Sequence, residues 1–226
     1  MRVLFCNIAW MSYYKGNIDG KDTPQGGGSY VAENQDAYEK FNFLPTPMTF
    51  KDESLNGDYC LGFVETKSTN RTDSNQLALE KIDGCQGAKN DEAVEDVLVI
   101  YCARYPFSEK RETLVVGWYK HADVYRRYEE QDFLDDKGNV AYVQAFNAFA
   151  KKEDCVLLPT GVRRRGNTWV VPRKNDKYAK YGFGQSNVWF ANDPSNEALQ
   201  VFLKRIIDQI ENYDGINWID FDGSEG

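Results

Sequence analysis

Three kinds of side chain that together can hold a planar base recur along this chain. Tryptophans lie at the ends of three apolar runs, and an aromatic ring stacks on a nucleic-acid base with about 1–3 kcal/mol per base. Amides and a hydroxyl near these runs are groups that read base edges. A pocket that takes one base out of its stack needs this combination. The predicted base-binding residues are Trp10, Asn42, Trp118, Ser186, Asn187 and Trp189.

Cationic side chains that could hold phosphates are concentrated in one stretch. Residues 163–180 carry seven Lys/Arg and one Asp, a local charge of +6 in a chain of net charge −8. The acidic remainder argues against a general, phosphate-driven binder and fits a basic face on an acidic body. A single solvated basic loop is the alternative. The predicted phosphate-binding residues are Lys120, Arg163, Arg164, Arg165, Arg173 and Lys174.

Several familiar catalytic centres are excluded by composition. The single histidine, His121, and five widely spaced cysteines without a C-x-x-C pair form no zinc pattern, no catalytic triad and no HNH centre. A glycine-rich stretch at residues 16–29 fails as a phosphate-binding loop because Asp22 follows Lys21. We therefore expect no cofactor and no metal. The cysteines indicate buried thiols in a reducing, cytoplasmic compartment, since neither a signal peptide nor an apolar membrane span is visible.

One catalytic pattern remains as an alternative. Asp58 precedes an apolar run that ends in Glu65-Thr66-Lys67. Magnesium nucleases of the PD-(D/E)XK class hold a metal with such carboxylates and place the lysine near the attacked phosphate. The pattern is short, the interval between the two acids is tight, and the usual Pro-Asp pair is absent. A solvated strand end explains the same residues, so this nuclease is the alternative and a protein-interaction module is another.

The elements that must position these residues are organised around a predicted β-hairpin. Two apolar runs, residues 97–103 and 113–120, flank a turn that contains Pro106. Apolar residues occupy both parities of the first run, so we expect both faces of a central strand pair to be covered. Gly117 would let another backbone or a ligand come close, whereas Trp118 next to it could equally fill the core.

Further elements follow from the same reasoning. The residue pattern predicts strands at residues 2–10, 59–66 and 142–150. It predicts an acidic loop at residues 129–139. A helix is predicted with Asp193 as cap, Pro194 at its first position and Gly215 beyond its end. The acidic, Gly/Ser-containing residues 214–226 are expected to form a linker or tail, which would make residues 1–213 one domain at the front of a longer protein.

Several segments resemble known recognition modules. Residues 96–101 and 115–118 resemble the core of EVE-type domains of the PUA-like superfamily, which includes the YTH and ASCH modules. Longer segments are similar to an N-terminal module of bacterial HNH endonucleases and other restriction-type proteins: FCNIAWMSYYKG, GGSYV, VVGWYKHADVYR, EDCVLLP and GQSNVWFAND. The resemblance implies a compact β-barrel with flanking helices that binds a flipped, modified base, with Trp118 near its pocket and cleavage supplied by a further C-terminal domain.

These observations lead to one prediction. We expect an α+β domain: a PUA/EVE-like curved antiparallel sheet or partial β-barrel with flanking helices, a long N-terminal insertion and a C-terminal packing helix. We expect it to recognise a modified base in nucleic acid, DNA first, within a bacterial defence protein, and to perform no catalysis itself. Its partner would be double-stranded DNA, with no membrane involved.

Overall fold

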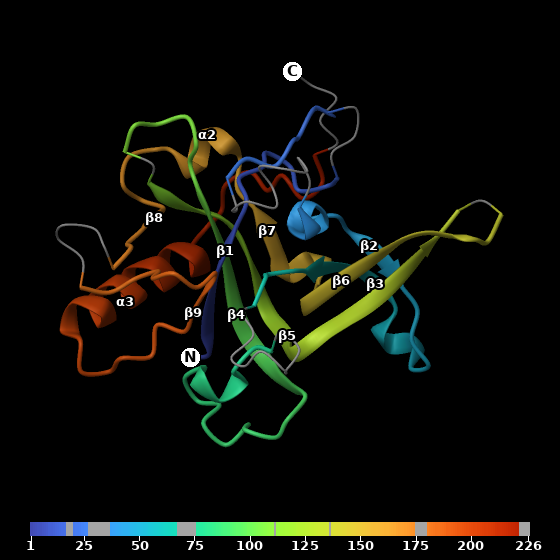
Figure 1. The fold of residues 1–226 in the computed structure, drawn as a ribbon, viewed down its shortest axis with the longest axis horizontal. Coiled ribbons are helices and arrows are strands. Elements are labelled where there is room, and N and C mark those ends of the chain that lie inside the picture. The colour runs from blue at the N-terminus through green and yellow to red at the C-terminus, as the bar shows by residue number, and fades with distance from the viewer. Residues whose placement is uncertain are drawn as a thin grey trace.

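The structure is a computed structural model that describes residues 1–16, 20–26, 37–66, 76–110, 112–135, 137–174 and 180–221. Its main element is a mixed nine-stranded sheet in the order β2-β3-β6-β5-β4-β1-β9, with β7 and β8 paired to β5. The sheet curves strongly without closing, and helix α3 covers one of its faces (Figure 1). The strands are β1 Val3–Ile8, β2 Thr46–Met48, β3 Gly57–Gly62, β4 Ala93–Arg104, β5 Thr113–Leu134, β6 Val140–Lys151, β7 Cys155–Leu157, β8 Val170–Val171 and β9 Val188–Trp189.

Few helices accompany the sheet in the described part of the chain. The α-helices are α2 Thr160–Arg163 and α3 Glu197–Glu211, and the 3-10 helices are η2 Tyr38–Phe41, η3 Glu53–Leu55, η4 Leu79–Lys81 and η5 Lys152–Asp154. The predicted curved sheet with a C-terminal packing helix is thus confirmed at this level. The sheet is not purely antiparallel, because β1 runs parallel to β4. None of the described helices has the length and apolar character needed to cross a membrane.

Strand β5 is the element on which the sheet is built. One of its edges pairs with β4 and the other pairs in turn with β8, β7 and β6. The predicted hairpin is therefore confirmed. The predicted acidic loop at residues 129–139 is wrong over its first half, since β5 continues to Leu134 where β6 supplies a partner. The end of β5 and the start of β6 together form an arm that projects from the body at the right of Figure 1.

Both faces of the central strands are buried, as the sequence predicted. Along β4, Val97, Val99 and Tyr101 face the core enclosed by the curved sheet. The alternate residues Leu98 and Ile100 face a second core on the other side. This period-2 separation follows from strand geometry, in which successive side chains point to opposite faces. Two apolar layers therefore fix the register of β4 from both sides.

Helix α3 closes the second core with the apolar face that the sequence predicted. Leu199, Phe202, Ile206 and Ile210 are its buried residues. It starts later than predicted, because Asn196 caps it by accepting a hydrogen bond from the Leu199 N–H, 3.1 Å away. The helix therefore keeps its predicted face but gains a different cap.

Residues expected to belong to a linker instead pack on the domain. The Asn217 side chain accepts the Leu157 N–H and donates to the Cys155 carbonyl, both at 2.9 Å. Ile219 is buried in the main core, and Trp218 stacks on Tyr13 with ring centroids 5.2 Å apart. The domain therefore extends to residue 221, and the rest of the predicted tail lies outside the described residues.

Candidate functional site

Polar side chains meet where β1 ends. The Asn7 N–H donates to the Asn187 carbonyl at 2.7 Å, and the Asn7 side-chain amide lies 3.5 Å from that of Asn187. The Arg173 guanidinium donates to Asn7 Oδ1 at 3.4 Å and to Thr113 Oγ1 at 3.3 Å. The Asn187 amide donates to Glu65 Oε2 at 3.2 Å. We call Asn7, Glu65, Thr113, Arg173 and Asn187 the end cluster.

The sheet topology brings these distant residues together. Because β1 and β4 are parallel, their carboxyl ends lie at one end of the sheet, and the start of β5 at Thr113 is paired there with Arg104. In Figure 1 the end of β1, the β4–β5 turn, β8 and α2 lie together at the upper left. Carboxyl ends of parallel strands are common places for ligand sites in open α/β sheets.

Arg173 is placed by a tight backbone crossing. It forms a bridge with Phe183, one residue after Gly182, whose φ is 117°. A Cβ on Gly182 would lie 2.0 Å from the Pro172 carbonyl oxygen, so this position requires glycine. The guanidinium carbon lies 5.7 Å from the centroid of the Phe183 ring. Stacking on an aromatic ring orients an arginine while leaving its edge available to donate.

Within the described residues, the side-chain hydrogen bonds that join members of the end cluster to one another are long. They measure 3.2 to 3.5 Å, compared with about 2.9–3.0 Å for the commonest N–H···O distance. Thr113 is buried, Asn7, Arg173 and Asn187 are half-buried, and Glu65 is exposed. Such polar groups are held in place only weakly by one another. A ligand with better geometry could replace these contacts at little cost.

Exposed cations border the end cluster. Lys174 follows Arg173, and its N–H is held by the Phe183 carbonyl at 2.9 Å. Arg164 donates to the Tyr105 hydroxyl at 2.9 Å, and Tyr105 is tied to the β4–β5 turn. Arg165 is exposed beside it. Four of the six predicted phosphate-binding residues thus lie at this end of the sheet: Arg164, Arg165, Arg173 and Lys174.

The other two predicted phosphate-binding residues are used by the fold. Arg163 is 0% exposed, and its three nitrogens donate to the carbonyls of Leu158, Met11 and Ser12 at 2.6 to 2.8 Å. Burial lowers the pKa of its guanidinium to about 10. Lys120 forms an ion pair of 2.8 Å with Glu211 on α3. Neither group is presented to a phosphate together with the cations at the end of β1.

Two predicted base-binding residues lie in the main core or beside it. The Asn42 amide pairs with the backbone N–H and carbonyl of Phe63, each at 2.9 Å, so it acts like a strand partner. Trp10 is buried, packs on Tyr105 with centroids 4.9 Å apart and has the Arg163 guanidinium carbon 5.2 Å from its ring centroid. Both side chains are therefore occupied by contacts within the chain.

Trp118 and Trp189 lie on the α3 side of the sheet. Trp118 is 1% exposed and packs on Trp169 and Tyr213, with centroids 5.5 and 5.4 Å apart. This is the core-filling alternative that the sequence left open. Trp189 is half-buried against Phe5, 4.7 Å between centroids. Ser186 is exposed and accepts the Val188 N–H at 3.1 Å, next to the end cluster.

The alternative nuclease residues are not gathered around one point. Asp58 lies at the start of β3, opposite Pro47 of β2. Glu65 lies beyond the other end of that strand and contacts Asn187. Lys67 falls outside the described residues. Within the described residues, no group of three or more His, Cys, Asp or Glu side chains is arranged to hold a metal ion.

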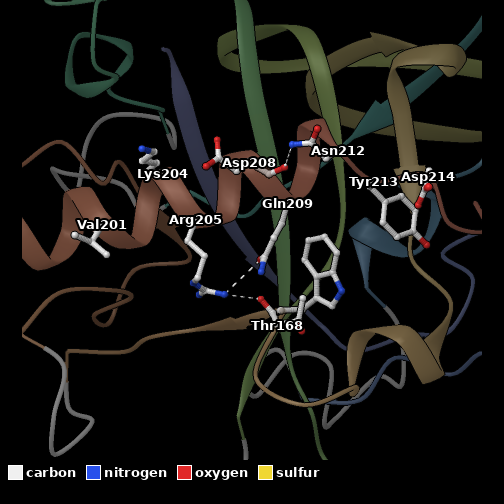
Figure 2. Close-up of a pocket in the computed structure, with 10 residues that line it drawn as sticks. Thr168, Val201, Lys204, Arg205, Asp208, Gln209, Asn212, Tyr213 and Asp214 are labelled. Atoms are coloured by element: carbon white, nitrogen blue, oxygen red, sulfur yellow. Dashed lines mark hydrogen bonds between the residues drawn. The ribbon is translucent and has the colours of Figure 1, made fainter.

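An open groove of about 690 Å³ lies beside α3. Figure 2 shows Arg205 reaching across it from α3 to the Thr168 carbonyl, 2.7 Å away. Its charges, from Lys204, Arg205, Asp208 and Asp214, cancel. A smaller cavity of about 250 Å³ lies between η2 and β6. The groove therefore offers no net attraction to phosphate, unlike the end of β1.

Sequence reasoning missed two members of the end cluster, Asn7 and Thr113. The available signal was their setting, because each is a polar residue inside or beside an apolar run of a strand. A polar side chain at such a position usually has a partner or a function. In comparisons with known proteins, the chain matches no family model, no curated protein and no solved structure.

Proposed function

We propose that this chain binds nucleic acid, double-stranded DNA in the first instance, and recognises a modified base in it. The finer identity that we propose is a PUA-like, EVE-type reader that serves a bacterial restriction or defence protein, with cleavage supplied by a C-terminal nuclease domain. The observation that carries the proposal is the end cluster. Side-chain amides, a guanidinium and exposed cations from separate parts of the sequence converge there.

The chemistry of the end cluster suits an edge-reading site bordered by phosphate contacts. The amides of Asn7 and Asn187 carry both donors and acceptors, as the edge of a base does. The Arg173 fork can grip either a phosphate or a base edge. Arg164, Arg165 and Lys174 can neutralise phosphates around it. Since the chain is acidic overall, with a net charge of −8, we expect few phosphate contacts and a shallow dependence of affinity on salt.

A binding titration tests this proposal. Labelled duplexes of one sequence would carry cytosine, methylated, hydroxymethylated or glucosylated cytosine, or methylated adenine, at moderate salt without divalent metal. We expect one modification to bind at least about tenfold more tightly, or about 1.4 kcal/mol. Arg173→Gln should weaken binding about tenfold through the loss of a charged hydrogen bond. The control Arg127→Gln removes an exposed arginine near Glu92 and should leave binding unchanged.

The outcomes separate the three functional hypotheses. Equal and weak binding of every duplex, unaffected by Arg173→Gln, would reject the reader and leave the protein-interaction module. Cleavage that requires magnesium would favour the nuclease instead. A preference for one modification together with unchanged affinity in Arg173→Gln would show that the end cluster is the wrong site.

A further inference from the structure

The arm formed by β5 and β6 extends beyond the other strands of the sheet. Its two strands pair with each other over residues 129–134 and 140–146. Strand β4 accompanies β5 only to Tyr125, and β3 accompanies β6 only from Ala148 onward. In the described part of the chain, no further strand borders the arm. A two-stranded ribbon by itself is marginally stable in water, and open strand edges are places where another chain adds. The arm therefore has the form of a docking element.

One face of the arm carries exposed apolar side chains. Val143 lies opposite Asp132 in the strand pairing, and Val140 lies opposite Leu134. Because side chains alternate between the two faces of a strand, Asp132 and Leu134 share one face of β5. Leu134, Val140 and Val143 are 63%, 52% and 48% exposed. We call Asp132, Leu134, Val140 and Val143 the arm face.

Carboxylates surround the apolar side chains of the arm face. The described residues from 129 to 146 carry four carboxylates and one ammonium, that of Lys137. All four carboxylates are exposed: Glu129, Glu130, Asp132 and Asp135. Such a surface repels a phosphate and also repels a second arm. It favours a partner that supplies cations together with apolar rings.

The β4–β5 turn presents this complementary chemistry on the same chain. Phe107 is 70% exposed and packs edge-on against Tyr105, with ring centroids 5.6 Å apart. The Arg164 guanidinium carbon lies 5.3 Å from the Tyr105 centroid. Aromatic rings and arginine are the residue types that contribute most at protein interfaces. In the turn, the exposed Glu109 and Lys110 balance each other. The other exposed cations of this end are Arg104, Arg164, Arg165 and Lys174. We call Tyr105, Phe107 and Arg164 the aromatic ridge.

The arm and the aromatic ridge lie on opposite sides of the molecule. In Figure 1, where the longest axis is horizontal, the arm projects at the right and the β4–β5 turn lies at the upper left. The arm of one copy therefore does not reach its own aromatic ridge. A second copy rotated by 180° and placed alongside brings its aromatic ridge to the first arm and its own arm to the first aromatic ridge. A reciprocal contact of this kind has two-fold symmetry and closes after two copies.

We propose that two copies of this chain form an antiparallel dimer in which the arm face of each copy docks on the aromatic ridge of the other. The apolar side chains of the arm face cover the exposed Phe107 ring. The carboxylates around them meet Arg164 and its neighbouring cations. This inference goes beyond the proposed function and does not rest on it, because neither surface needs nucleic acid.

The first test measures the self-association of the full chain in the absence of nucleic acid. Sedimentation velocity at moderate salt follows the protein from about 1 μM to about 1 mM. We expect the mass to rise from that of one chain to that of two and no further, since the reciprocal contact closes. A mass of one chain at every concentration overturns the inference and leaves the arm to a different, basic partner. Growth beyond two chains overturns the closed dimer.

The second test reverses one charge on each surface. Asp132→Lys on the arm face and Arg164→Glu on the aromatic ridge should each weaken the dimer at least about tenfold, because like charges then meet in both contacts. The matched controls are Asp208→Lys and Lys204→Glu, which reverse exposed charges on α3 and should leave the dimer unchanged. Loss of the dimer in the two controls instead would place the contact on α3 and overturn the inference.

Mixing the two charge-reversed proteins identifies which surfaces meet. Asp132→Lys keeps its aromatic ridge, and Arg164→Glu keeps its arm face, so one contact of a mixed dimer is unaltered. In the other contact the two substituted side chains again have opposite signs. We therefore expect the mixture to dimerise although neither protein does so alone. A dimer of two arms would persist in Arg164→Glu by itself, and that result, or a mixture that stays monomeric, overturns the inference.

A substitution without a change of charge covers the case in which a charge reversal disturbs the fold. Val143→Thr keeps the branched shape that suits a strand and makes the arm face more polar. It should weaken the dimer about threefold to tenfold. Val201→Thr changes a valine on α3 that is 70% exposed and should have no effect. Equal dimerisation of the Val143→Thr and Val201→Thr proteins overturns the inference.

Discussion

Asp22 and Arg163 hold the same turn from opposite sides. The Asp22 carboxylate accepts the backbone N–H groups of Ser12, Tyr13 and Tyr14 at 2.5, 2.7 and 3.0 Å. The Arg163 guanidinium donates to the carbonyls of Met11 and Ser12. The turn after β1 is thereby fixed by two charges that the sequence places far apart. A residue expected to bind phosphate stabilises the segment that follows the end cluster.

Arg163→Met should therefore lower the free energy of unfolding by about 3 kcal/mol, because it leaves buried carbonyls of Leu158, Met11 and Ser12 without their donors. Urea unfolding measures this. Arg164→Gln, the exposed neighbour, should change stability by less than about 0.5 kcal/mol. For DNA binding we expect the opposite order, with the larger effect in Arg164→Gln. This variant should reduce the slope of log affinity against log salt concentration by about one. Equal stability of the two variants would contradict the assignment of Arg163 to the fold.

Trp118 should behave as a core residue. Trp118→Ala removes a ring packed between Trp169 and Tyr213, and we expect a loss of about 3–5 kcal/mol. Trp118→Phe should cost less, since it also removes an indole N–H that has no partner among the described residues. Thermal unfolding measures both. If Trp118→Phe keeps full stability but loses base preference, Trp118 contacts the ligand after all.

The framework of the fold could be predicted from local patterns. Hydrophobic periodicity predicted the central hairpin, β1, β6 and the buried face of α3, because those patterns depend only on which faces are covered. Gly117 was predicted to allow a close approach, and a Cβ there would lie 2.3 Å from the Val156 carbonyl oxygen of β7. The length of β5 could not be predicted, because its acidic second half depends on pairing with β6.

The candidate site was harder to predict because it depends on topology. Asn7, Thr113 and Arg173 become neighbours only through the parallel pairing of β1 with β4 and the crossing at Gly182. Tryptophan and arginine suggested ligand binding by residue type, yet burial decides between ligand contact and packing. Trp118 and Arg163 are buried. Residue type alone could not distinguish them from Trp189 and Arg173.

Alkaline pH should destabilise the fold. Burial raises the pKa of the Cys6, Cys102 and Cys155 thiols above 9.0 and of the Tyr14, Tyr101 and Tyr119 phenols above 10.0. The folded state therefore holds these protons longer than the unfolded state. Their stabilisation is complete below about pH 9 and is lost as pH rises toward the folded pKa values, by up to about 1.4 kcal/mol per pH unit for each group.

Arg163 acts in the opposite direction. Burial lowers its pKa in the folded state to about 10, so its contribution to the free energy of unfolding rises with pH above about 10. The six groups with a raised pKa outweigh the one group with a lowered pKa. The net free energy of unfolding should therefore fall as the pH rises. Urea unfolding from pH 8 to 11 under reducing conditions measures the slope. Cys6→Ala should make it shallower by one proton, whereas Ile8→Val should lower stability equally at every pH. An unchanged slope in Cys6→Ala would refute this account.

Glu65 gives a direct comparison between the reader and the nuclease. As a carboxylate beside Asn187, it repels phosphate at the end cluster. If the chain is a reader, Glu65→Gln should strengthen binding of any duplex about two- to fivefold at low salt and less at high salt. The matched control is Glu130→Gln, an exposed residue on the arm, which should change little. If the chain is a PD-(D/E)XK nuclease, the wild type should cut plasmid DNA with magnesium and Glu65→Gln should abolish cleavage. We expect no cleavage by either protein, and metal-dependent nicking that disappears in Glu65→Gln would replace the reader with the nuclease.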